Sequence, residues 1–194
     1  MKLDRKKTYY KVTNKEENHH GLQYHDGLVK DILPFCADAK KSCVAGGIYF
    51  TDIHNIGAFF NYGCWVRPIT IPARAKAILD PEGGKFRADM VKMGKRIDKI
   101  IFLAKLPKKY KGPLDLRGCD LKGITLPTSV GGYLYLGDCD LKGITLPTSV
   151  GGSLDLHGCD LAGITLPTSV GGDLDLSGCK IPKSLDLSKY NVIK

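Results

Sequence analysis

The sequence predicts an α+β domain over residues 8–100, followed by a short β-solenoid of 20-residue repeats. The first supporting observation is a repeated block, CDLKGITLPTSVGG, which occupies residues 119–132 and again residues 139–152. The block returns at residues 159–172 with Ala162 in place of a lysine. Self-similarity at a fixed period near 20 residues is typical of a solenoid, in which each repeat forms one coil.

The second supporting observation is an uneven distribution of charge. The chain has a formal net charge of +9. Residues 1–110 hold 21 Lys or Arg against 11 Asp or Glu, whereas residues 111–194 hold 8 Lys or Arg against 9 Asp. A division of this kind suggests two units with different partners.

Composition narrows the broad class of protein. The 194 residues are 43% hydrophobic and 25% charged, the balance of a soluble globular protein. No apolar run approaches the ~18 residues of a membrane span, and the first residues lack the apolar stretch of a signal peptide. The seven cysteines are odd in number and contain no C-x-x-C pair. We therefore expect reduced thiols and a cytoplasmic rather than a secreted protein.

The residue pattern of one repeat predicts how its coil is built. Leu134 and Leu136 alternate with Tyr133 and Tyr135, so the leucines should face the core and the tyrosines the solvent. Pro147 should end regular pairing on the returning arm of the coil.

The glycine pair of each repeat and the two ends of the solenoid complete this prediction. Gly151-Gly152 should supply a tight turn with positive φ before the next strand. Because one coil cannot bury its apolar face alone, stacked coils form the core and each end needs a cap. We expect a basic junction or cap over residues 101–112 and a C-terminal tail over residues 188–194.

Each unit reads x-L-x-L-x-x-C-x-L-x-x-I-x-L-P and is similar to a short leucine-rich repeat, with the cysteine at the place of the usual ladder asparagine. The resemblance covers about residues 106–187 and implies leucine-rich-like repeats over residues 113–187. The Val-Gly-Gly before each strand departs from that pattern, so a generic β-solenoid coil is the alternative. The cysteine column is interpreted as stacked small side chains, because a straight ladder lacks the tetrahedral convergence that zinc requires.

The repeats differ mainly at the outward strand positions, which should form one face of a parallel sheet. A recognition surface and neutral drift at exposed positions both explain this variation. Four coils spaced by ~4.8 Å make a face narrower than an average interface. The face is weakly acidic and carries two aromatic residues, so a protein partner is favoured over nucleic acid. The candidate partner-binding residues are Arg117, Tyr133, Tyr135, Asp155, His157, Asp173 and Asp175.

The first half of the chain contains short hydrophobic runs separated by turn residues. The expected strands are residues 9–12, 21–24, 43–50, 64–71, 75–79 and 86–93. A short helix is expected at residues 53–62, capped by Thr51 or Asp52. Together these elements predict the α+β class of residues 8–100.

A basic run joins the two halves and contains a single acid, Asp98. Either it is a solvated linker, or it contacts an anionic partner such as nucleic acid through phosphates, without reading sequence. The candidate residues are Lys92, Lys95, Arg96, Lys99, Lys105, Lys108, Lys109 and Lys111.

Five segments of the first half carry a resemblance to a known group of proteins. They are YKVTNK at 10–15, GLQY at 21–24, GGIYFTD at 46–52, FFNYG at 59–63 and WVRPITIP at 65–72. Residues 9–96 resemble an uncharacterised N-terminal domain of giant, mimivirus-like DNA virus proteins, in which it is often fused to repeats, more commonly of the ankyrin type. The resemblance implies a location in the host cytoplasm or the virion and brings no known activity.

A fainter similarity concerns catalysis. GIYFTD at 47–52 followed by AFFNY at 58–62 is similar to the strand–helix motif of ADP-ribosyltransferases of the poly-ADP-ribose polymerase type. This similarity implies that Tyr49 stacks on the nicotinamide of NAD. It also implies a His or Arg on an earlier strand, for which His25 is the candidate, and usually a glutamate on a later strand that orients the ribose and assists attack. The only later glutamate, Glu82, lies in a turn rather than on a strand.

The remaining residues suggest neither a metal site nor a resident cofactor. His19, His20 and His25 with Cys36 and Cys43 match no known metal-ligand spacing. We therefore expect a non-enzymatic interaction or structural module that binds a protein partner through the outward strand face. The alternatives are a virion component that contacts capsid or nucleic acid through its basic half, and a degenerate ADP-ribosyltransferase-like domain.

Overall fold

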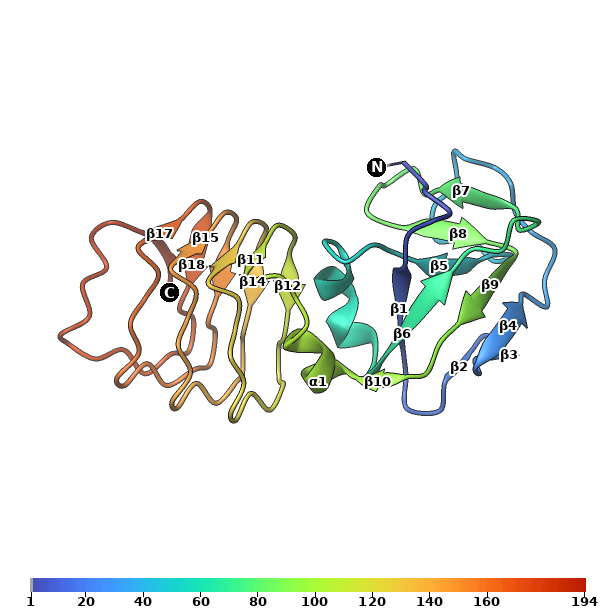
Figure 1. Ribbon diagram of the computed structural model, residues 1–194. Helices are drawn as coiled ribbons and strands as arrows, with labels where there is room; N and C mark the ends of the chain where they lie inside the picture. Colours follow the sequence, from blue (N-terminus) through green and yellow to red (C-terminus); the bar gives the residue numbers. More distant parts are fainter. Residues whose placement is uncertain (1) are drawn as a thin grey trace. The chain divides into compact units, whose positions relative to one another are not determined.

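The computed structural model describes residues 2–194, whose regular elements are mostly short strands with few helices (Figure 1). The chain divides into two compact units. The first comprises the residues up to Ile56 together with Tyr62–Lys99, and the second comprises Gly57–Asn61 together with Ile100–Lys194.

The larger sheet of the first unit is antiparallel, with strand order β1-β6-β9-β4 and a short strand β10 that also pairs with β6. Its strands are β1 (Tyr9–Thr13), β4 (Gly27–Lys30), β6 (Trp65–Thr70), β9 (Met90–Met93) and β10 (Ile97–Asp98). A second antiparallel sheet has the order β5-β8-β7, with β5 (Ile48–Phe50), β7 (Ala77–Leu79) and β8 (Phe86–Ala88). A hairpin pairs β2 (Asn18–His19) with β3 (Leu22–Gln23).

Aromatic side chains of both sheets form the centre of the first unit's core. Tyr9 of β1 contacts Phe50 and Phe86 edge-to-face, with ring centroids 5.3 Å apart in each pair. Phe50 and Phe86 stack on each other at 5.7 Å. All three residues are buried, so the two sheets share one apolar core.

Several predicted elements of the first half need correction. The expected strand at 43–50 is regular only at Ile48–Phe50, because Cys43, Gly46 and Gly47 have positive φ angles of 51°, 83° and 153° that interrupt extended backbone. The expected strand at 86–93 is divided at Asp89 into β8 and β9, which belong to different sheets.

The helix expected at 53–62 is a 3₁₀ helix, η1 (Ile56–Tyr62). The Oδ1 atom of Asp52 accepts hydrogen bonds from the backbone N–H groups of His54 and Asn55, so Asp52 rather than Thr51 caps the turn before it. The five-residue α1 (Lys99–Leu103) is the α-helix of the described residues. The α+β class of the first half therefore stays a prediction.

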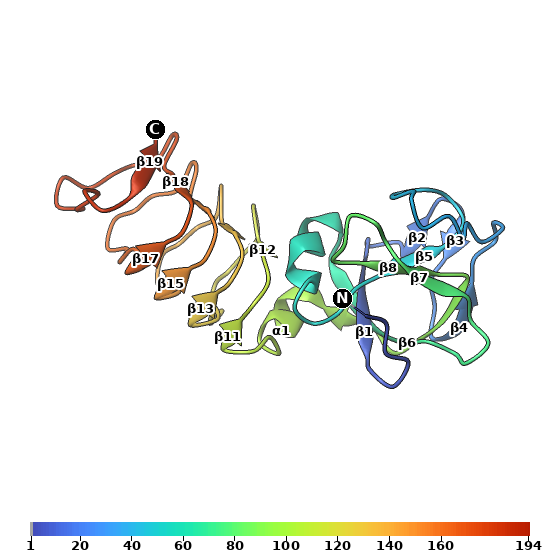
Figure 2. The same cartoon turned by 90° about the horizontal axis from the view of Figure 1, so that it is seen from above.

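The second unit is a β-solenoid of about four turns, in which two parallel sheets run along the stack of coils (Figure 2). One sheet contains β11 (Lys109–Tyr110), β13 (Ser129–Val130), β15 (Ser149–Val150) and β17 (Ser169–Val170). The other contains β12 (Leu114–Asp115), β14 (Leu134–Tyr135), β16 (Leu154–Asp155), β18 (Asp173–Asp175) and β19 (Asn191–Ile193). Equivalent residues pair with a shift of 20, as in Leu134 with Leu154.

The predicted inward and outward sides of the L-x-L strands are confirmed. Leu114, Leu134, Leu154 and Leu174 are each 0% exposed. Regular pairing, however, does not end at Pro147, because Ser149 and Val150 form a second strand in register with the coils on both sides.

Gly151 and Gly152 form the predicted bend between β15 and β16, but the positive φ predicted for them is wrong. Gly151 and Gly152 are not among the residues with positive φ. A Cβ atom on Gly151 would lie 2.3 Å from the carbonyl oxygen of Gly131 in the preceding coil. Glycine is therefore required at this position because neighbouring coils approach too closely for a side chain.

Candidate partner-binding face of the solenoid

The outward side chains of β12, β14, β16 and β18 and of the residues next to these strands form a continuous strip. We call this strip the variable face. Register places Asp115, Tyr135, Asp155 and Asp175 side by side on successive coils. The seven residues selected from the sequence therefore lie along one sheet: Arg117, Tyr133, Tyr135, Asp155, His157, Asp173 and Asp175.

Two stacked tyrosines and an arginine mark the first coils of the variable face. The rings of Tyr133 and Tyr135 lie 4.2 Å apart between centroids and only 15° from parallel. The guanidinium carbon of Arg117 lies 5.2 Å from the centroid of the Tyr135 ring. Both tyrosines are half-buried, so they expose aromatic surface in a fixed arrangement.

Arg117 is held by Asp115 beneath it. Its Nε and Nη2 atoms donate hydrogen bonds of 2.9 and 2.6 Å to the two carboxylate oxygens. These bonds raise the pKa of Arg117 further above its ordinary value. Asp115 is only 3% exposed. Unlike the outward residues Tyr135, Asp155 and Asp175 at the same place in the later coils, Asp115 is therefore buried, because the arginine covers it.

Carboxylates dominate the later coils of the face. Asp155 accepts a hydrogen bond of 2.9 Å from the backbone N–H of His157. Asp175 accepts bonds from the hydroxyl and the backbone N–H of Ser177, which lower the pKa of its carboxyl group. Asp173 accepts a hydrogen bond from the amide group of Asn191. The acidic residues are thus oriented by local bonds.

His157 lies over the preceding coil at a place where that coil has no side chain. A Cβ atom on Gly137 would lie 2.7 Å from Nδ1 of the histidine. The histidine Nε2 atom is 3.8 Å from Oδ1 of Asp138. The residues at this position in neighbouring coils therefore depend on each other, since Gly137 in one coil makes room for His157 in the next.

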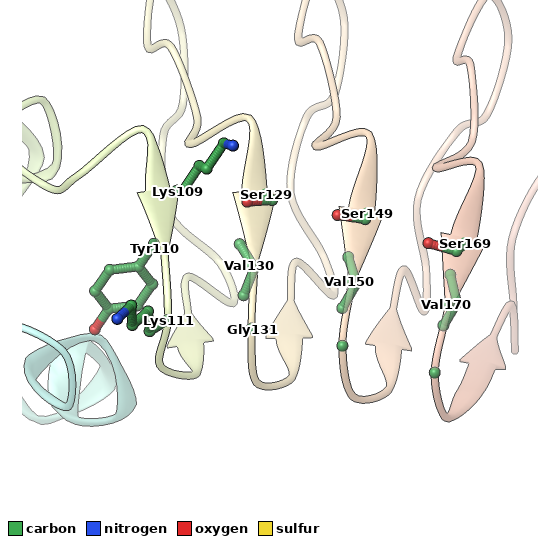
Figure 3. Close-up of a pocket in the computed structure, with 12 residues that line it drawn as sticks. Lys109, Tyr110, Lys111, Ser129, Val130, Gly131, Ser149, Val150, Ser169 and Val170 are labelled. Atoms are coloured by element: carbon green, nitrogen blue, oxygen red, sulfur yellow. The ribbon is translucent and has the colours of Figure 1, made fainter.

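The other sheet of the solenoid carries a shallow depression that the sequence did not reveal (Figure 3). Its volume is about 410 Å³. Ser129, Ser149 and Ser169 occupy equivalent places along it, and Lys109 and Lys111 lie at its first coil. The constant Thr-Ser-Val-Gly of each repeat was the available sequence signal for this second sheet. It was missed because only two residues of each coil form a strand there, and they come shortly after a proline.

The basic residues selected from the sequence fall in both compact units, with Lys92, Lys95, Arg96 and Lys99 in the first. Arg96 is already engaged within its own unit. It lies 4.4 Å above the ring of Trp65 and donates a 3.2 Å bond to Glu17. In the second unit, the lysines of the run are all exposed: Lys105, Lys108, Lys109 and Lys111.

The two residues considered for catalysis make different contacts. The Tyr49 hydroxyl accepts hydrogen bonds from the Val44 backbone N–H, at 3.0 Å, and from Arg87, at 3.1 Å. His25 is exposed, with its Nδ1 atom 2.9 Å from the carbonyl oxygen of Asp26. The transferase hypothesis stays a prediction. Among residues 2–194 no cluster of three or more His, Cys, Asp or Glu could hold a metal ion.

The fold and this face define a β-solenoid repeat protein. The chain is similar to a putative ankyrin repeat protein of Acanthamoeba polyphaga mimivirus, with 39% identity over 47% of this chain and 47% of that protein. A second putative ankyrin repeat protein of the same virus is 35% identical over 47% of this chain and 34% of its own length. An uncharacterised protein of that virus is 40% identical over 34% of this chain and 48% of its own length.

These similarities relate the chain to mimivirus repeat proteins. The chain spans about half, or less, of the length of the relatives it matches. It matches no known family profile and no solved structure. Within residues 2–194, no helix has the length and hydrophobicity that a membrane crossing requires.

Proposed function

We propose that this chain is a non-enzymatic interaction module whose variable face binds a protein partner. The observation that carries the proposal is the contrast between constant and variable positions. The inward leucines are identical in every coil and fully buried, whereas the outward neighbours change from coil to coil. Viral repeat-protein relatives are consistent with an interaction role.

The chemistry of the variable face favours a protein as its partner. Tyrosine and arginine are enriched among the residues that dominate binding energy in interfaces. Stacking of Tyr133 on Tyr135 and the bidentate Asp115–Arg117 pair restrict these side chains before binding, which lowers the entropic cost of ordering them. The neighbouring Asp155, Asp173 and Asp175 favour a partner that presents basic groups beside an apolar or aromatic anchor.

We also propose that the coils are of a leucine-rich type, with cysteine at the position of the ladder asparagine. The thiols of Cys139 and Cys159 donate hydrogen bonds to the carbonyl oxygens of Leu116 and Leu136 in the preceding coil, at 3.1 and 3.3 Å. A side-chain donor that satisfies the carbonyl of a neighbouring coil is the task of a ladder residue.

A viral setting, in the host cytoplasm or in the virion, is part of the same proposal. Its support is the similarity to mimivirus proteins, and the segments at 10–15, 46–52 and 65–72 are the basis of the resemblance in the first half. Two relatives are putative ankyrin repeat proteins, so they share with this chain the presence of repeats, although the type of repeat differs.

A second candidate function is contact with an anionic polymer. It is favoured by the four exposed lysines of the second unit, Lys105, Lys108, Lys109 and Lys111. Their charges lie within seven residues and face solvent, which suits phosphates rather than base edges.

Affinity capture with matched variants tests the first proposal. The full chain would be immobilised in parallel with Tyr133→Ala/Tyr135→Ala and with Ser129→Ala/Ser149→Ala, which alters the other sheet. Extract of amoebae infected with the virus should yield a protein retained by the wild type and the serine variant but lost from the tyrosine variant. Equal retention by all three would remove the variable face from the proposal.

A further inference from the structure

A cysteine and a lysine lie in direct contact next to the start of β8, the middle strand of the β5-β8-β7 sheet. The Lys85 ammonium donates a 3.0 Å hydrogen bond to the Cys43 sulfur and a 3.2 Å bond to Glu82 Oε2. Cys43 is exposed, whereas the Lys85 side chain is only 14% exposed. The thiol is therefore reachable from solvent while its cationic neighbour is fixed in place.

A buried carboxylate lies behind this pair. Asp80 is 0% exposed, and its Oδ1 atom is 3.8 Å from the Lys85 ammonium and accepts a 2.6 Å bond from the Ser42 hydroxyl. Its Oδ2 atom is buried and has no hydrogen-bond partner within residues 2–194. A buried carboxylate so close favours a charged lysine, and a charged lysine favours the thiolate form of the cysteine.

The segment that carries Cys43 is anchored to the sheet by Arg87 and Tyr49. Arg87 is 0% exposed and donates hydrogen bonds to the carbonyl oxygens of Lys41 and Asp38. The Tyr49 hydroxyl accepts a hydrogen bond from the backbone N–H of Val44. These bonds hold Cys43 in a left-handed conformation, with φ of 51°, which is uncommon for a residue other than glycine.

The other thiols lack this environment. Cys43 is the exposed one of the seven cysteines. Hydrogen bonds from Lys85 and Ser42 lower its pKa. By contrast, burial raises the pKa of Cys139 to about 11 and also raises the pKa of Cys159 and Cys179. Susceptibility to oxidation follows thiolate character and exposure, and both favour Cys43.

We propose that Cys43 and Lys85 form an oxidation site at which a hydroperoxide closes a covalent sulfur–nitrogen crosslink. With hydrogen peroxide, the thiolate attacks one oxygen, the O–O bond breaks and an S–OH group forms. The leaving hydroxide takes a proton from the Lys85 ammonium to give water and a neutral amine. The amine then attacks the sulfenic sulfur, the S–N bond forms, and the S–O bond breaks with release of a second water.

The crosslink would tie the anchored segment around Cys43 to the residue that precedes β8. The product is a sulfenamide that contains two hydrogen atoms fewer than the reduced pair. Thiol reductants cleave such a bond, so the site is a reversible crosslink between two residues that lie 42 positions apart in the chain.

Peptide mass spectrometry of the full chain after hydrogen peroxide treatment tests this proposal. A peptide pair joined through Cys43 and Lys85, two hydrogen atoms lighter than the separate peptides and released by dithiothreitol, is expected. Recovery of Cys43 as sulfinic acid with Lys85 unlinked, or faster oxidation of another cysteine, would overturn it.

Two lysine variants separate the roles of charge and nucleophile. Lys85→Arg keeps a cation beside the sulfur but removes the amine, so a sulfenic acid that reacts with dimedone should accumulate without a crosslink. Lys41→Arg changes a lysine of the same segment and should leave the crosslink yield unchanged. A crosslink that persists in Lys85→Arg would show that another group attacks the sulfur and would refute the assignment.

Discussion

The cysteine of each coil contributes both packing and a hydrogen bond. Cys139 is 5% exposed, and its thiol donates to the Leu116 carbonyl of the preceding coil at 3.1 Å. Cys119 holds the equivalent place in the first coil, but it is only half-buried, and no thiol hydrogen bond is found for it within residues 2–194. The two positions therefore share a sequence environment while differing in burial and bonding.

Replacing Cys139 by alanine should lower the free energy of unfolding by about 1–2 kcal/mol, because a buried hydrogen bond and packing volume are lost together. Cys119→Ala should change it by less than about 0.5 kcal/mol, as is usual for a less buried site. Urea unfolding of both variants measures this difference. Equal losses would argue against a role for the thiol hydrogen bond.

The same cysteine predicts a dependence of stability on pH. Burial raises the folded-state pKa of Cys139 from 9.0 to about 11, so its stabilising contribution is complete below pH 9 and is lost as pH rises toward 11. The stability advantage of the wild type over Cys139→Ala should therefore narrow between pH 9 and 11. Urea unfolding across this range measures it, and a constant gap would contradict the buried-thiol account.

At the scale of the coil, contact between backbones decides which glycines are required. Gly151→Ala would place its Cβ 2.3 Å from the Gly131 carbonyl oxygen, so we expect a loss of about 3 kcal/mol. Gly163 has φ of 74° with nothing within 4 Å, so alanine there should cost about 1 kcal/mol from backbone strain alone. Thermal unfolding compares the two. A larger loss at Gly163 would show that turn conformation, not coil contact, governs the stack.

The lysines near β11 give a second prediction at this scale. If all four exposed lysines bind phosphates, log affinity for duplex DNA should fall with log salt at a slope of about −4, and Lys105→Gln/Lys108→Gln/Lys109→Gln should reduce the slope to about −1. Preference among DNA sequences should not change, because phosphate contacts carry no base information. A gel-shift titration at several salt concentrations measures the slopes. A flat dependence, or no shift at 50 mM salt, would assign these lysines to solubility.

At the scale of the whole molecule, the features predicted correctly from the sequence are those carried by the 20-residue repeats. Alternation of leucine with changing residues placed Leu134 and Leu136 in the core and Tyr133 and Tyr135 on the face, because strand geometry alone determines these sides. The second sheet was missed because Ser149 and Val150 pair only with neighbouring coils, and two residues carry no detectable periodicity.

Features that depend on residues distant in sequence were not predictable from one chain. The contact of Cys43 with Lys85 spans 42 residues, and Arg87 bonds the carbonyl oxygen of Lys41, just before the cysteine. Arg117 buries Asp115 because its side chain folds back onto the carboxylate. The alternation of inward and outward residues along a strand does not specify that side-chain conformation. The close approach of Gly151 to Gly131 likewise depends on the distance between stacked coils.

On the proposed function, the solenoid binds a protein partner through Tyr133 and Tyr135. The decisive measurement is isothermal titration of the captured partner against the wild type, Tyr133→Ala/Tyr135→Ala and Ser129→Ala/Ser149→Ala. We predict a Kd at least about 30-fold weaker for the tyrosine variant, the effect of losing about 2 kcal/mol of interface energy, and an unchanged Kd for the serine variant. An unchanged Kd for the tyrosine variant, with its fold intact by circular dichroism, would contradict the claim.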